Sequence, residues 1–240
     1  LNAKILRDMI RQTVYAVSEN TAKPIYTGSL YEIEDGVFKI IAIDGYRMAI
    51  RSENVDSESK NRFVVPGKTQ HEVLKLLTDD EENTEIIIGQ RHITFKIKNY
   101  RIISRLIEGT FIEYKSAIPK ETKTEVVINT RTIIDAVERM SLLNNDRIQS
   151  PVRCIFSDDE IKLSCTSAVG RADDVISVPI IGESVEIGFN NRYLLGALKN
   201  ADTDEIKLIL NGSLTAMIVK PVKGDSYLSI VVPMRLANEN

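Results

Sequence analysis

The sequence contains no tryptophan, two cysteines and two histidines among its 240 residues. Cys154 and Cys165 form no C-x-x-C motif, and His71 and His92 lie far from them along the chain. These counts argue against a disulfide framework and a zinc ribbon. No apolar run approaches the roughly 18 residues that a membrane-spanning helix needs, and no signal peptide is visible. We therefore expect a cytoplasmic protein without a metal, another cofactor or a membrane partner.

The sequence also lacks a strong excess of either charge. Lysine and arginine number 31, aspartate and glutamate number 34, and the formal net charge is −3. Residues 1–120 hold 18 basic and 17 acidic residues, whereas residues 121–240 hold 13 and 17. Since neither half is strongly basic, net charge alone does not indicate nucleic-acid binding. Evidence for nucleic-acid binding would have to come from the positions of individual lysines and arginines.

The most informative positive feature is a long internal repeat. Residues 2–10 (NAKILRDMI) match residues 129–137 (NTRTIIDAV), 127 positions later. Solenoid units run roughly 20–50 residues, so this period is too long for a solenoid and is about the length of one ordinary domain. We predict two copies of one domain, residues 1–120 and residues 121–240.

A finer repeat lies inside each copy. A β-run precedes a helical pattern at 63–77, 126–140 and 185–199, and about three further β-runs follow each helix. Asp35-Gly36 and Asn211-Gly212 are hairpin signals between neighbouring β-runs. The sequence therefore predicts an α+β fold, in which each domain is a duplicated β-α-β-β-β unit with helices on one face of antiparallel sheets. The first unit begins at its helix, so we expect its first strand to be missing.

The predicted helices carry cations opposite their apolar stripes. On the first helix Leu6, Met9, Thr13 and Val17 form the stripe. The opposite faces of the helices carry Lys4, Arg7, Arg11, Lys68, Lys75, Arg192 and Lys199. These cations either form an ordinary solvated surface or a weak, sequence-independent surface for phosphates.

Two further segments are candidate sites. The turn Asp44-Gly45-Tyr46-Arg47 concentrates polar groups, but a catalytic role would need a paired base or nucleophile, and none is near in sequence. The apolar segment 229–236 lies next to the end of the chain, where most chains fray. An apolar end that stays ordered must pack on its own domain or on a partner. We expect a structural or binding role for both segments.

The two domain copies, the run Ile43-Asp44-Gly45-Tyr46-Arg47-Met48 and the run Val232-Pro233-Met234-Arg235-Leu236 together resemble the bacterial DNA polymerase III beta subunit, the sliding clamp. The resemblance covers essentially the whole chain, as the second and third of the family's three domains. It implies a head-to-tail dimer that closes a ring of six domains around duplex DNA. The helices line the hole, and the ring acts as a processivity factor.

The resemblance also implies partners and their pocket. Full-length members form a homodimer and bind duplex DNA non-specifically, the DNA polymerase III alpha subunit, the clamp loader, and other polymerases and repair proteins. Partners use short peptides of the Gln-Leu-x-Leu-Phe type. The positions that match the peptide pocket are Tyr26, Ile43, Gly45, Tyr46, Arg47, Met48, Ile112, Ala117, Asn190, Tyr193, Ile230, Val232, Pro233, Met234, Arg235 and Leu236. The sequence departs from the family at Tyr26, Ile112 and Ser116-Ala117, which bears on peptide preference.

Two other sets follow from the resemblance. The expected DNA-facing residues are Arg11, Lys23, Lys68, Lys75, Arg192 and Lys199, and the expected dimer edge is Leu142 and Leu143. Without the first domain, we expect this chain to be a monomer or a weak associate. Two alternatives remain: a peptide-binding adaptor with the clamp fold but no DNA role, and an enzyme that uses the Asp44–Arg47 turn. A processivity factor without catalysis is the favoured interpretation.

Overall fold

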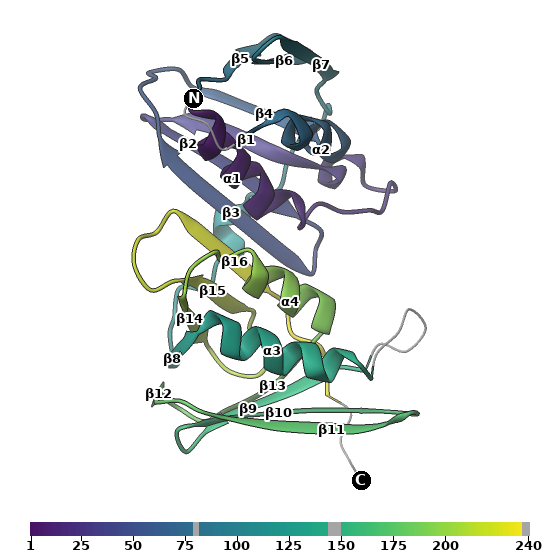
Figure 1. Ribbon diagram of the computed structural model, residues 1–240, viewed down its shortest axis with the longest axis vertical. Coiled ribbons are helices and arrows are strands. Elements are labelled where there is room, and N and C mark those ends of the chain that lie inside the picture. The colour runs from purple at the N-terminus through teal and green to yellow at the C-terminus, as the bar shows by residue number, and fades with distance from the viewer. Residues whose placement is uncertain (79–81, 144–149, 237–240) are drawn as a thin grey trace. The chain divides into compact units, whose positions relative to one another are not determined.

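The computed structural model describes residues 1–78, 82–143 and 150–236. The chain divides into two compact units, Leu1–Glu113 and Tyr114–Asn240. Figure 1 shows helices and antiparallel strands in each unit. The predicted α+β class with two tandem domains is therefore confirmed.

The first unit contains two helices and two antiparallel sheets (Figure 1). The helices are α1 (Ala3–Val14) and α2 (Gly67–Leu76). One sheet has the order β3 (Arg47–Asn54), β2 (Val37–Ile43), β1 (Gly28–Glu34), β4 (Asn61–Pro66). The other has the order β5 (Glu85–Ile88), β6 (His92–Ile97), β7 (Tyr100–Arg105). A short 3-10 helix, η1, spans Pro24–Thr27.

The second unit repeats this plan. Its helices are η2 (Tyr114–Ala117), α3 (Thr130–Ser141) and α4 (Asn191–Lys199). One set of paired strands is β12 (Ile180–Gly182), β8 (Thr124–Asn129), β14 (Glu205–Leu210), β15 (Met217–Pro221), β16 (Tyr227–Val231). The other is β11 (Gly170–Ser177), β10 (Glu160–Ser167), β9 (Val152–Ser157), β13 (Val185–Phe189). In both units a strand leads directly into a helix, as the finer repeat predicts.

The repeated asparagines of the sequence are helix caps. The side-chain oxygens of Asn2, Asn129 and Asn190 accept hydrogen bonds from the first backbone N–H groups of α1, α3 and α4, at 3.2, 3.0 and 2.9 Å. An N-cap acceptor satisfies one of the donors that a helix start leaves unpaired. Helix α2 begins after Pro66 without such a side-chain bond. The internal repeat is therefore visible in sequence partly because the same cap recurs.

One of the two predicted hairpins is present as a tight turn, and the other is a wider loop. Asp35 and Gly36 both have positive φ, 51° and 73°, and connect β1 to β2 in the expected tight turn. The second signal, Asn211-Gly212, is followed in the sequence by the β-run 214–219, which predicts a strand from Leu214. That expectation is wrong, because β15 begins at Met217 and Leu214 is exposed in a wider loop. Gly212 has a left-handed φ of 91°. Strand β15 pairs with β16 from Met217, opposite Val231, and with β14 from Ile218, opposite Ile209.

Each unit has its own apolar core. In the first, the stripe of α1 packs with buried residues of both sheets, among them Tyr31, Ile40 and Phe95. In the second, α3 and α4 pack against each other and against strands of both sheets. Helix α1 ends at Val14, so Val17 lies beyond the helix that was predicted to contain it. Cys154 and Cys165 are buried thiols that are not joined in a disulfide. Burial raises the pKa of the Cys154 thiol to about 12, so it is not a reactive nucleophile.

No helix within the described ranges is long and apolar enough to cross a membrane. Among residues 1–78, 82–143 and 150–236, no three His, Cys, Asp or Glu side chains gather in a way that could hold a metal ion.

Candidate functional site

The turn between β2 and β3 is fixed by one carboxylate. Asp44 accepts hydrogen bonds from the backbone N–H groups of Tyr46 (2.9 Å) and Arg47 (3.0 Å), and from the Nε of Arg47 (2.9 Å). Gly45 takes a φ of 95°, which few other residues adopt readily. The Arg47 guanidinium also lies over the ring of Tyr15, 5.4 Å from its centroid. These contacts hold the backbone and the Arg47 side chain of the turn in one conformation.

This turn presents an aromatic side chain to solvent. Tyr46 is exposed, whereas Met48 is buried and Ile43 half-buried. On another segment of the same unit, Tyr26 of η1 packs edge-to-face on Phe111, with 5.8 Å between ring centroids. Ile112 follows Phe111 and is exposed. The first unit thus offers Tyr46 and Ile112 as accessible contacts, with Met48 and Phe111 as buried support.

The second unit holds its C-terminal segment against β13. The Met234 N–H donates to the Gly188 carbonyl oxygen at 2.8 Å. A Cβ at Gly188 would lie 2.6 Å from Cδ2 of Leu236 and 3.0 Å from the Met234 carbonyl oxygen, so a larger residue here would displace the Leu236 side chain. Gly188, Met234 and Leu236 line a groove of about 660 Å³. Val185, Ile187 and Leu214 also line it. The apolar end therefore packs on its own unit and leaves an open groove.

Sequence reasoning missed Gly188 and this groove. A glycine inside the β-run 185–189 signals a close backbone approach, and that signal could have found the position.

The other pocket residues predicted in the second unit differ in how far their side chains are buried. Asn190 caps α4 and bonds to the backbone N–H of Tyr193 at 3.4 Å. Ile230 is buried, Tyr193, Pro233, Met234 and Leu236 are half-buried, and Ala117, Val232 and Arg235 are exposed.

The expected DNA-facing cations divide into two groups. Arg11 lies 3.6 Å from the Asp8 carboxylate, Lys75 lies 2.7 Å from Glu72, and Lys199 lies 2.6 Å from Glu138. The hydrogen bond from Lys199 holds the pKa of the Glu138 carboxyl below its usual value. Lys23, Lys68 and Arg192 are exposed, and their side chains form no ion pair with the residues that the structure describes. Half of the expected cations are thus already partly neutralised.

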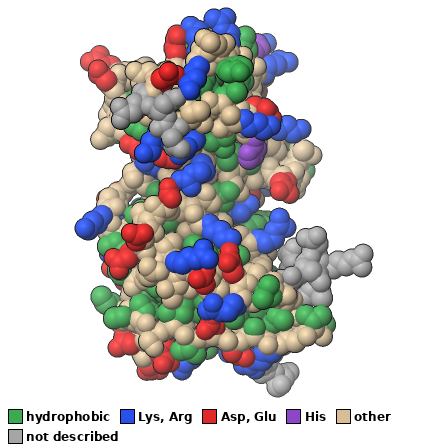
Figure 2. Space-filling view, viewed as in Figure 1, with side chains coloured by type: hydrophobic (Ala, Val, Ile, Leu, Met, Phe, Trp, Pro, Cys, Tyr) green, Lys and Arg blue, Asp and Glu red, His purple; other side chains and the backbone are tan. Residues whose placement is uncertain are grey.

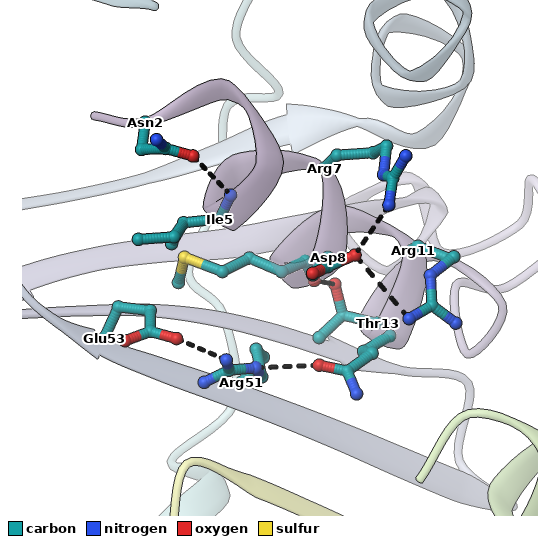
Figure 3. A network of polar contacts seen from close by, with 10 residues as sticks. Asn2, Ile5, Arg7, Asp8, Arg11, Thr13, Arg51 and Glu53 are labelled. Atoms are coloured by element: carbon teal, nitrogen blue, oxygen red, sulfur yellow. Dashed lines mark hydrogen bonds and ion pairs between the residues drawn. The ribbon is translucent and has the colours of Figure 1, made fainter. Parts of the chain in front are cut away.

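Figure 3 shows the carboxylate that pairs with the arginines of α1. The guanidinium groups of Arg7 and Arg11 both point toward the Asp8 carboxylate, at 3.4 and 3.6 Å. Arg51 on β3 contacts Glu53, and its Nε donates to Oε1 of Gln12 at 2.7 Å. Over α3 and α4, Figure 2 likewise shows acidic and basic side chains interspersed. The helical surfaces therefore carry moderate positive charge.

The expected dimer edge lies at the end of α3. Leu142 is 83% exposed, whereas Leu143 is half-buried against the core of the second unit. A large exposed leucine at a helix end is the kind of side chain that a protein interface covers.

Each of the two units matches a domain of one known protein family. Residues 1–113 match the family model of the DNA polymerase III beta subunit, central domain, and residues 115–235 match that of the C-terminal domain. Proteins named beta sliding clamp from Halalkalibacterium halodurans and Bacillus subtilis are 33% and 31% identical to the chain and align with 98% and 96% of it. The chain spans 64% and 62% of their lengths.

Solved structures give the same result. The DNA polymerase sliding clamp of Bacillus subtilis matches with a TM-score of 0.95 and 30% identity, over 99% of this chain and 64% of that one. A sliding clamp of Pseudomonas aeruginosa bound to griselimycin matches with a TM-score of 0.93 and 27% identity, over 98% of this chain and 64% of that one.

Proposed function

Because the chain belongs to the DNA polymerase III beta subunit family, we propose that it is the part of a sliding clamp that holds partner proteins and contributes helices to the DNA-facing surface. In this role it is a processivity factor without catalysis. The full-length protein dimerises through an edge that includes Leu142 and Leu143, encircles duplex DNA and tethers the replicative polymerase, the clamp loader and repair proteins.

The observation that carries the DNA part of this proposal is the partial neutralisation of the helix cations. A protein that slides must attract phosphates without holding any one of them tightly. Bound carboxylates such as Asp8 and Glu138 reduce the pull of Arg11 and Lys199, while Lys23, Lys68 and Arg192 stay available. Contacts limited to phosphates carry no sequence information, which suits a ring that passes over every sequence.

The partner part is supported by features of each unit taken separately. The first unit supplies a rigid turn with exposed Tyr46, and the second supplies the C-terminal segment with Met234 and Leu236 beside an open groove. Aromatic and methionine side chains on a fixed backbone suit anchors for short apolar peptides. The ligand class is an extended peptide with aliphatic and aromatic residues, and Arg47 and Arg235 provide its polar rim.

Duplex DNA binding tests the DNA role. We expect a fluorescein-labelled 30-base-pair duplex, a length of roughly three helical turns, to bind weakly and equally well in two unrelated sequences. The affinity should fall steeply with salt, with a slope of log K against log salt near −3 if about three phosphates are neutralised. Fluorescence anisotropy across a salt titration measures this. Binding that is absent at low salt would favour the adaptor alternative, and salt-insensitive or sequence-specific binding would contradict sliding.

A further inference from the structure

The sheet β5-β6-β7 has an outward face that none of the roles above uses. Ile93, Phe95 and Ile97 of β6 are buried in the core of the first unit. Side chains alternate along a strand, so Thr94 and Lys96 point the other way. The register aligns Ile87 of β5, Thr94 and Ile103 of β7 in one row across this outward face. Ile87 and Ile103 are 42% and 61% exposed, so the row is an open aliphatic strip.

Unpaired arginines flank this strip. Arg101 and Arg105 lie two residues before and after Ile103 on β7, and therefore on the same face. Both are exposed, and neither forms an ion pair with any residue in the described ranges. Lys96, opposite Arg101, is 2.9 Å from Glu85 and is partly neutralised. Among the described residues, Arg101 and Arg105 are therefore cations of this face that form no ion pair.

The charge of this segment differs from that of the whole chain. Residues 85–108 contain five basic and two acidic residues, whereas the chain has a net charge of −3. At the top of Figure 2, over β5–β7, Lys and Arg atoms lie beside hydrophobic atoms. A local cationic surface with an apolar centre on an otherwise acidic protein selects for an anionic partner.

We propose that the Arg101–Ile103–Arg105 face, made of these three residues with Ile87 and Thr94, docks an extended acidic segment of a partner protein. The two arginines are four residues apart on a strand, about 13 Å. An extended segment with the pattern acidic-x-aliphatic-x-acidic has the same spacing. Its carboxylates would meet Arg101 and Arg105, each able to form a bidentate pair, and its aliphatic side chain would cover Ile103.

The face fits a protein segment better than a nucleic acid. Single strands bind basic surfaces on which aromatic side chains stack with bases. The central row of this face is Ile87, Thr94 and Ile103, and the imidazole of His92, opposite Arg105, lies at its end. The exposed Tyr100 pairs with Ile97, whose side chain points to the core. Tyr100 therefore belongs to the opposite side of β7. Arginine beside an apolar centre is a composition typical of protein interfaces.

A short peptide tests the proposal. Fluorescein-labelled Gly-Glu-Thr-Ile-Thr-Glu-Gly should bind the full chain saturably in fluorescence polarisation, and the same peptide with both glutamates replaced by lysine should not. Arg101→Glu with Arg105→Glu should weaken binding about ten-fold or more, because two attractive pairs become repulsive. Ile103→Ser should weaken it about five-fold. Both changes are at exposed positions, so the fold should be retained, as far-UV circular dichroism can verify.

Matched variants separate docking from net charge. Lys120→Glu with Lys223→Glu makes the same charge change at exposed positions of the second unit, and should leave peptide binding within about two-fold. An equal loss in this control would overturn the proposal, as would a lack of saturable binding. A twelve-nucleotide oligo-dT that binds more tightly than the peptide, and is lost with Arg101→Glu and Arg105→Glu, would also overturn it by assigning the face to nucleic acid.

Discussion

Phe189→Ala should lower the free energy of unfolding of the protein by about 3–5 kcal/mol, the usual cost of removing a fully buried phenylalanine. Phe189 is fully buried at the end of β13, opposite Val152 of β9. It immediately precedes Asn190, which caps α4. Losing the ring leaves a cavity within the core that α3, α4 and both sheets of the second unit share. The expected loss is therefore larger than for any exposed position.

Urea unfolding followed by far-UV circular dichroism measures this effect. Val169→Ala is a suitable control, because Val169 is exposed in the same unit and its truncation should cost less than about 0.5 kcal/mol. A loss below about 1 kcal/mol for Phe189→Ala would show that the core relaxes around the missing ring. It would contradict the expectation that Phe189 is a close-packed part of the core of the second unit.

Reversing three of the expected DNA-facing cations, those that form no ion pair with a described residue, should nearly abolish duplex binding. In the triple variant Lys23→Glu, Lys68→Glu and Arg192→Glu, attraction to phosphates becomes repulsion at the positions where no carboxylate now competes. Each lost phosphate contact should move the slope of log K against log salt toward zero by about 0.9. At 50 mM salt we expect the affinity to fall by more than about ten-fold.

The matched control reverses the same number of exposed lysines elsewhere: Lys115, Lys120 and Lys223. Both triple variants change the net charge equally, so fluorescence anisotropy with the same labelled duplex isolates the effect of position. Equal losses in the two variants would mean that only overall charge matters. That outcome would remove Lys23, Lys68 and Arg192 from the DNA-facing set.

The local parts of the fold were predictable from sequence because they depend on near neighbours. The Asn caps, the hairpin at Asp35-Gly36 and the strand-to-helix units all have short-range causes. The start of β15 was not predictable, since it depends on where Ile209 meets Ile218 across the sheet. The boundary expected after residue 120 stays a prediction.

The candidate sites were predictable mainly through the family resemblance. Residue patterns alone located the Asp44–Arg47 turn and the apolar C-terminal segment. They could not show that Gly188 lies against Leu236, or that Glu138 pairs with Lys199, because these contacts join segments far apart in the chain. The pair of Asp8 with Arg11 has the i,i+3 spacing of a helix, so the sequence pattern could have indicated it. The pairing of cations matters for function, since it sets how strongly the helices can hold a phosphate.

The most direct test of the account is the binding of a labelled Gln-Leu-x-Leu-Phe peptide to this chain, measured by fluorescence polarisation. The account predicts saturable micromolar binding that Met234→Ala weakens by about 1–2 kcal/mol, or roughly 5–30-fold. Val169→Ala, which trims an exposed side chain of the same unit, should leave the affinity unchanged. An absence of binding, or an affinity that Met234→Ala does not alter, would contradict the claim that this chain carries the partner site of a sliding clamp.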